Sequence, residues 1–152
     1  MKHNNKIGII GLGFLGGTLA RYFEKNHSEY RLFFYDKKGI GSPGEINRAD
    51  IVFVCVNTPY SSKLKTMDLS FLESALTSIR GRKIVVIRSS VIPGTMARLQ
   101  KKFAKLKLLL NPEFLREKYP DKDFLRPPMQ IIGYTKQSKP YAKKILSLLP
   151  SA

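Results

Sequence analysis

The 152-residue sequence contains one cysteine, Cys55, and no tryptophan. A single cysteine excludes a framework of intrachain disulfides and suits a reducing compartment. No apolar run reaches the roughly 18 residues of a membrane-spanning helix. Glycines interrupt the apolar stretch from Ile7 to Ala20, which argues against a secretory signal. We therefore expect a cytoplasmic protein that has no membrane partner.

Acidic residues are also scarce, with 11 Asp and Glu against 27 Lys and Arg, for a formal net charge of +16. The charge is uneven, because residues 76–152 contain 17 basic and 4 acidic side chains. Such a field attracts anions, including nucleic acids, dinucleotides and sugar diphosphates. A lysine-rich surface can equally serve solubility alone, so charge does not identify the partner.

The hydrophobic fraction of 43% is that of an ordinary globular protein, and the length fits a single domain over residues 1–152. Apolar strand-like runs alternate with helical patterns, which is typical of a parallel sheet covered by helices. We predict a doubly wound, mostly parallel Rossmann-type α/β sheet of about six strands with helices on both faces. The expected strands are Lys6–Ile10, Arg31–Tyr35, Ile51–Val56, Lys83–Ile87, Leu106–Leu110 and Met129–Ile132.

Segments in which apolar residues recur with helical spacing separate most of these strands. Leu15, Leu19 and Phe23 recur on one face of a first helix, and Ser70 with Glu73 fits a capping box at the start of a helix over Leu69–Arg80. Only fourteen residues, Lys37 to Asp50, separate the second and third strands. This shortened second crossover leaves space for one or two helical turns.

The motif Gly11-Leu12-Gly13-Phe14-Leu15-Gly16 has G-x-G-x-x-G spacing. It follows a strand and opens a helix, and Asp36 ends the next strand, which is the context of a dinucleotide-binding turn. The helix N-terminus offers amide donors to a pyrophosphate, and Asp36 can accept from ribose hydroxyls. The charge of Asp36 favours NAD over NADP, although Lys37 and Lys38 weaken that preference. A purely structural βαβ turn is the alternative.

Three further loops follow predicted strands and are expected at the same carboxyl edge of the sheet, where ligands bind in such folds. Each loop taken alone is also explained by turn chemistry. The loops are Asn57-Thr58-Pro59, Ser89 to Thr95, and Asn111 to Glu117.

Together these residues resemble the NAD-binding domain of the UDP-glucose/GDP-mannose dehydrogenases. The similarity extends from about Lys6 to Tyr134 in the order of that family. It is carried by Ala49–Pro59, Met67–Ser70, Val85–Val91 with Gly94-Thr95, and Asn111–Glu117.

The resemblance implies a role for individual positions. The pyrophosphate is expected to contact Gly11, Gly13, Phe14 and Leu15, with Gly16 completing the turn. The adenosine ribose is expected to contact Asp36. Thr58 and Ser90 are expected near the nicotinamide end. Glu113 and Glu117 correspond to two glutamates of the family, one of which helps manage the water of thioester hydrolysis. Phe114 and Leu115 correspond to residues lining the nucleotide-sugar site. No metal site is expected.

The sequence also departs from the family. The family's glycine after the second glutamate is Lys118, and its threonine is Ser90. The central helix and the C-terminal UDP-sugar domain, which supplies the nucleophilic cysteine, are absent from the sequence. Cys55 lies in an apolar strand and is expected to be a buried hydrophobe rather than that nucleophile.

Three functions follow. The first is the NAD-binding part of a nucleotide-sugar dehydrogenase, a truncated product or one completed by a complementary C-terminal domain chain. The alternatives are a non-catalytic NAD or nucleotide-sugar binding module and a basic nucleic-acid-binding protein on a Rossmann core. Nucleic acid is the least favoured partner, because no nucleic-acid motif is present. The oligomeric state stays open.

Overall fold

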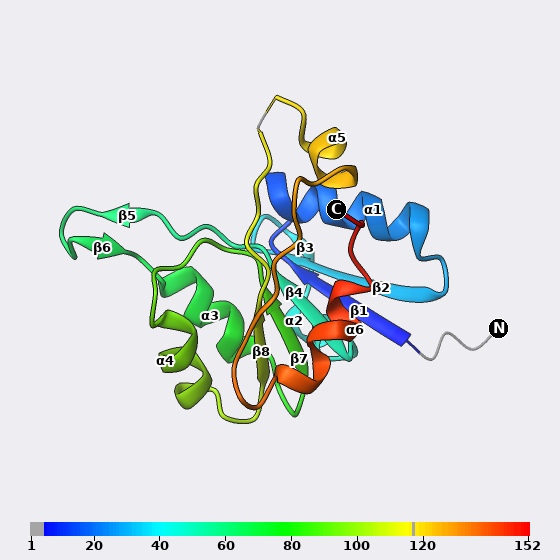
Figure 1. The fold of residues 1–152 in the computed structure, drawn as a ribbon. Helices are drawn as coiled ribbons and strands as arrows, with labels where there is room; N and C mark the ends of the chain where they lie inside the picture. The colour runs from blue at the N-terminus through cyan, green and yellow to red at the C-terminus, as the bar shows by residue number, and fades with distance from the viewer. Residues whose placement is uncertain (1–4, 117) are drawn as a thin grey trace.

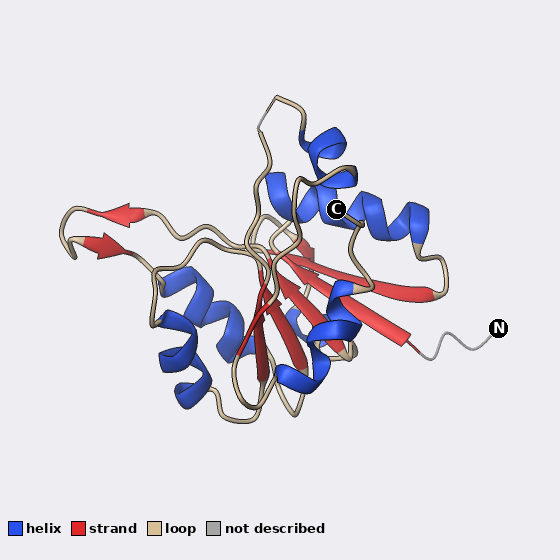
Figure 2. Cartoon of the chain, in the orientation of Figure 1, coloured by secondary structure: helices blue, strands red, loops and turns tan. Residues whose placement is uncertain are grey.

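The computed structural model describes residues 5–116 and 118–152 as a twisted sheet with helices on both faces (Figures 1 and 2). Its seven strands lie in the order β3-β2-β1-β4-β7-β8-β9. The five central strands are parallel, and β3 and β9 are antiparallel to their neighbours. The strands are β1 (Asn5–Ile10), β2 (Tyr30–Asp36), β3 (Ile40–Gly41), β4 (Ile51–Val54), β7 (Ile84–Ile87), β8 (Lys107–Leu110) and β9 (Gly133–Tyr134).

A short hairpin of β5 (Tyr60–Ser61) and β6 (Thr66–Met67) projects away from this sheet, at the left of Figure 1. The helices are α1 (Phe14–Asn26), α2 (Pro43–Ile46), α3 (Ser70–Ser78), α4 (Thr95–Lys102), α5 (Pro120–Leu125) and α6 (Ala142–Leu146), with a 3₁₀ turn at Lys139–Tyr141. Among the described residues, no helix is both long and apolar enough to cross a membrane.

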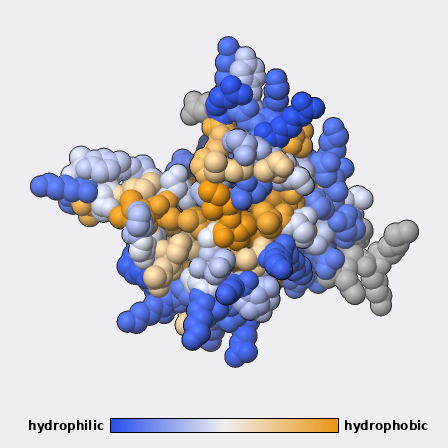
Figure 3. Space-filling view, viewed as in Figure 1, coloured by the Kyte–Doolittle hydropathy of each residue, from blue (hydrophilic) through white to orange (hydrophobic). Residues whose placement is uncertain are grey.

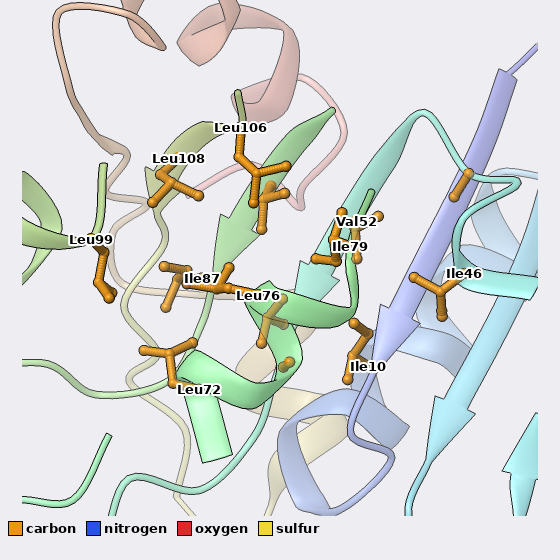
Figure 4. Packing of buried hydrophobic residues seen from close by; sticks show 14 of the residues in the cluster. Ile10, Ile46, Val52, Leu72, Leu76, Ile79, Ile87, Leu99, Leu106 and Leu108 are labelled. Carbon is orange, nitrogen blue, oxygen red and sulfur yellow. The ribbon is translucent and has the colours of Figure 1, made fainter. Parts of the chain in front are cut away.

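The central strands β4 and β7 are apolar along their whole length, as expected where both faces of the sheet are covered. Val52 and Val54 pack toward α2, α3 and α4, whereas their neighbours Ile51 and Phe53 pack toward α1 and α6. Figure 4 shows the first of these two clusters, in which Leu72 and Leu76 of α3 meet Ile87 of β7. Each such side chain contributes about 1.5–3 kcal/mol on full burial, so the sheet is held from both sides.

The predicted fold class is confirmed, and the shortened crossover contains one helical turn, α2, after the two-residue strand β3. The sixth predicted strand is wrong. Residues Met129–Ile132 form a loop, and only Gly133 and Tyr134 pair with β8. The carbonyl of Ile131 accepts from Asn111 Nδ2 at 3.0 Å instead of from a strand. Pro127 and Pro128, just before this segment, also lack the N–H donors of a ladder.

The predicted capping box is wrong too. Ser70 is the first residue of α3 rather than its N-cap, and its N–H donates to Asp68 Oδ1 at 2.8 Å. Glu73 faces α4, where it pairs with Arg98 at 3.0 Å and Lys102 at 2.5 Å. The carboxylate of Glu73 therefore forms ion pairs with α4 instead of capping the start of α3.

Candidate functional site

The glycine-rich turn joins the carboxyl end of β1 to α1. Gly11 has φ +84°, and its N–H donates to the carbonyl of Tyr35 at 2.9 Å. A Cβ on Gly16 would lie 1.8 Å from the carbonyl oxygen of Gly11. The first glycine thus supplies a left-handed backbone, and the third allows the helix to pass directly over the turn.

Gly13 differs, because a Cβ built there meets no atom within 4 Å. It is the N-cap of α1, makes no side-chain cap bond, and precedes a first turn without an acidic residue. Among the described residues, the N–H groups of Phe14 and Leu15 have no acceptor. Open space therefore faces unmet amide donors at the positive end of a 13-residue helix, an arrangement that suits a phosphate.

Asp36 lies beside this turn at the end of β2. One carboxylate oxygen accepts from the Leu12 N–H at 2.7 Å and the other from the Lys38 N–H at 2.8 Å. These two backbone hydrogen bonds hold the pKa of Asp36 below its usual value. The carboxylate is fixed in position and charged, and its remaining lone pairs can accept from ribose hydroxyls.

A pocket of about 290 Å³ opens between the turn, the ends of β1, β2 and β4, and one side of α3. The turn contributes Gly11 and Gly13, β2 contributes Asp36, and α3 contributes Phe71 and Ser74. Ligand pockets are commonly about 300–1,000 Å³, so this volume suits part of a dinucleotide, such as its adenosine, rather than the whole.

The loops after β4 and β7 meet at the same edge of the sheet. Thr58 Oγ1 donates to the carbonyl of Ser90 at 2.6 Å, and the buried Ser89 donates from Oγ to the carbonyl of Val56 at 2.5 Å. The hydroxyl side chain of Ser90 is exposed. Thr58 and Ser90 are thus brought together, but neither lines the pocket beside Asp36.

A buried arginine, Arg88, was missed by sequence reasoning. It is 2% exposed, forms an ion pair with Glu113, donates to Asn111 Oδ1, and lies over the ring of Phe124 at 5.2 Å. Burial lowers its pKa to about 10, so it stays a cation at neutral pH. The available signal was a charged residue directly after a strand that is apolar on both faces.

The segment after β8 is divided between this cluster and the surface. The Glu113 side chain is 12% exposed and turned toward Arg88, and its Oε1 accepts from the Phe114 N–H at 3.1 Å. Phe114 is 47% exposed, whereas Leu115 packs against the cluster on the α1 side. None of the three lines the pocket beside Asp36. Glu117 lies outside the described residues.

Cys55 directly follows β4 and is 7% exposed. Burial raises the pKa of its thiol to about 11, so it is protonated at neutral pH. Among the described residues, no group of His, Cys, Asp and Glu side chains could hold a metal ion.

The chain is similar to known proteins of one kind. Residues 19–148 match the UDP-glucose/GDP-mannose dehydrogenase family, NAD binding domain. A GDP-mannose 6-dehydrogenase of Pseudomonas syringae pv. tomato is 34% identical over 58% of this chain and 24% of its own length. A UDP-glucose 6-dehydrogenase of Rickettsia conorii is 34% identical over 69% of this chain and 26% of its own length.

Among solved structures, a UDP-D-ManNAc dehydrogenase from Pyrococcus horikoshii superimposes with a TM-score of 0.81 at 19% identity, covering 95% of this chain and 45% of that one. This likeness concerns the fold alone. The chain spans about a quarter of the length of the curated relatives it matches. From the family match over residues 19–148, the chain belongs to the UDP-glucose/GDP-mannose dehydrogenase family, of which it is an NAD-binding domain.

Proposed function

We propose that this chain binds NAD at the carboxyl edge of its sheet and serves the oxidation of a nucleotide sugar at its C6 alcohol. The observation that carries the proposal is the N-terminus of α1, where unmet N–H groups and the open space at Gly13 lie beside the fixed carboxylate of Asp36. When bound, NAD would supply the hydride acceptor for this oxidation. The protein residues bind and orient the reactants.

Each predicted residue has a proposed task. The pyrophosphate rests on the backbone of Gly13, Phe14 and Leu15, while Gly11 and Gly16 shape the turn. Asp36 accepts from the adenosine ribose, and its charge disfavours a 2′-phosphate. Thr58 and Ser90 lie along the cofactor toward the nicotinamide.

On the sugar side, Glu113 orients water or substrate, because the buried guanidinium of Arg88 holds its carboxylate in place. Phe114 offers an exposed aromatic face to a nucleotide sugar, while Leu115 packs against the cluster on the α1 side. Glu117 belongs to the same proposed set.

The nucleophilic thiol that holds the oxidised intermediate comes from outside this sequence in our proposal. Cys55 is unsuited, because its thiol is buried and protonated. A second polypeptide, or a further segment of a longer chain, would supply it. Because Cys55 is a free cysteine, which suits a reducing compartment, we place the protein in the cytoplasm.

Isothermal titration with NAD⁺ tests the binding step. We expect a saturable one-to-one isotherm and weaker binding of NADP⁺, because Asp36 repels the added phosphate. Absence of saturation at millimolar NAD⁺ would reject the cofactor site.

The burial of Cys55 favours a second candidate, a non-catalytic NAD-binding module. The two candidates differ when UDP-glucose or GDP-mannose and a thiol-bearing C-terminal domain of a relative are added. Turnover to NADH supports the dehydrogenase, and binding without turnover supports the module.

A further inference from the structure

Basic side chains gather at the opposite edge of the sheet, where β7 and β8 begin. The loop before β7 carries Arg80 and Arg82, and the end of α4 with the loop before β8 carries Lys101 and Lys105. With Lys107 and Lys136, these residues are called the basic edge below.

The fold brings three separate segments together here. β7 and β8 are parallel, and the Lys107 N–H donates to the carbonyl of Lys83 at 2.9 Å, so their two preceding loops are adjacent. β9 runs antiparallel to β8, so the chain after Tyr134 returns to the same edge. The buried Gln100 joins the segments, since its Oε1 accepts from the Leu108 N–H at 3.0 Å and from Thr135 Oγ1 at 2.9 Å.

These charges are not neutralised locally. No Asp or Glu occurs from Ser74 to Pro112 or from Phe124 to Ala152. Neighbouring cations are engaged, because Arg98 and Lys102 pair with Glu73 and Lys83 donates to the carbonyl of Ala49. In the part of the chain that the structure describes, no residue of the basic edge forms an ion pair.

Two residues of the basic edge, Arg80 and Lys105, line a groove of about 540 Å³ between the ends of α3 and α4. Arg80 and Gly81 line one side, and Phe103, Ala104 and Lys105 line the other. Side chains along this lower edge are hydrophilic in Figure 3, whereas apolar side chains gather at the centre of the same view. The large exposed apolar residues of the described chain include none between Phe71 and Ile92 or between Ile92 and Phe114.

We propose that the basic edge binds the phosphate backbone of a single-stranded nucleic acid without sequence preference. Unpaired Lys and Arg side chains supply the electrostatic attraction. The half-buried ring of Phe103, which packs against the core and has Lys102 Nζ 5.6 Å from its centroid, lines one side of the groove. A lipid surface fits less well, because the two loops lack the apolar anchors that help hold a protein at a membrane. This site is separate from the cofactor pocket and does not depend on it.

The test is fluorescence anisotropy with a labelled oligo(dT) of about 20 nucleotides, titrated at salt concentrations from about 50 to 200 mM. We compare the intact chain with R80E/R82E/K105E and with the matched variant K25E/K63E/K65E, which changes the net charge equally on other surfaces. Thermal unfolding and NAD⁺ titration check that each variant is folded.

We expect the basic-edge variant to lose at least about tenfold in affinity and its salt slope to fall by about 2, since each single-strand phosphate contact contributes about 0.7. The matched variant should lose less than about threefold. Equal losses in both variants would overturn the proposal in favour of diffuse charge. Absence of saturable binding at about 50 mM salt would also overturn it, as would a preference for phosphatidylserine vesicles that depends on the same residues.

Discussion

In our proposals, the two edges of this sheet bind phosphate through different chemical groups. At the carboxyl edge, the donors are backbone N–H groups of a rigid turn, and the nearest ionised side chain, Asp36, is negative. At the amino edge, the donors are long basic side chains around a groove that Gly81 also lines. Geometry therefore selects the ligand at the first edge and charge attracts it to the second, so salt should weaken binding far more at the amino edge.

The largest expected effect separates two glycines of one turn. Gly16→Ala should destabilise the fold by about 4 kcal/mol or more, because its methyl group would overlap the carbonyl of Gly11. Gly13→Ala should fold almost normally, since that methyl group meets only open space and φ is −68°. It should nevertheless lose NAD⁺ binding. Urea unfolding measures the loss of stability, and calorimetric titration measures NAD⁺ binding. If G13A binds NAD⁺ as tightly as the parent protein, the pyrophosphate does not lie at this position.

The buried cation at the carboxyl edge gives the next effect. Arg88→Met should cost about 3–5 kcal/mol in urea unfolding, because it leaves the carboxylate of Glu113 without its partner. The double variant R88M/E113Q should recover part of this loss, since the second change removes the stranded charge. A loss below about 1 kcal/mol for R88M would mean that the ion pair contributes little.

Asp36→Asn tests whether the carboxyl edge depends on a fixed charge. We expect a roughly 10- to 100-fold weaker NAD⁺ affinity, because charge-assisted hydrogen bonds contribute about 1.5–3 kcal/mol. The discrimination against NADP⁺ should fall as well. Because its folded pKa is lowered, Asp36 stabilises the fold above its unfolded pKa, and this contribution disappears as the pH falls through the folded pKa. An acid unfolding curve identical in D36N would contradict this.

The smallest effect concerns Cys55. Its folded pKa is raised to about 11, so the stability it contributes is complete below the unfolded value near 9.0 and declines as pH rises through 11. The decline should reach at most about 2–3 kcal/mol. Cys55→Ala should remove it, so the difference between the stability curves of the two proteins isolates the contribution of the thiol. Parallel curves would show that the thiol is not buried in solution.

Much of the fold follows from local patterns. Continuous apolar runs such as Ile51–Val54 predict strands that are covered on both faces, and G-x-G-x-x-G after a strand predicts the turn. Prediction failed where a distant partner decides the outcome. Glu73 forms an ion pair with α4 and does not cap α3. Asn111 donates a hydrogen bond to the carbonyl of Ile131, which a sixth strand would have used for strand pairing. The helix α5 and the β5–β6 hairpin were not predicted.

The candidate site divides in the same way. Gly11, Gly13, Gly16 and Asp36 were identified from spacing, because one short connection and one strand pairing fix their geometry. The cluster of Arg88, Asn111 and Glu113 was not identified as a unit, because its members come from two strand ends and meet only when β7 and β8 pair.

The sequence by itself determined the parallel sheet, the dinucleotide turn and the excess of positive charge, since each is a property of neighbouring residues or of composition. Only the tertiary structure decided where that charge lies and which carboxylate it neutralises. Burial and ion pairing depend on segments far apart in the chain, and Arg88 and Arg80 show the two outcomes. Arg88 is buried and forms an ion pair with Glu113, whereas Arg80 is exposed at the amino edge.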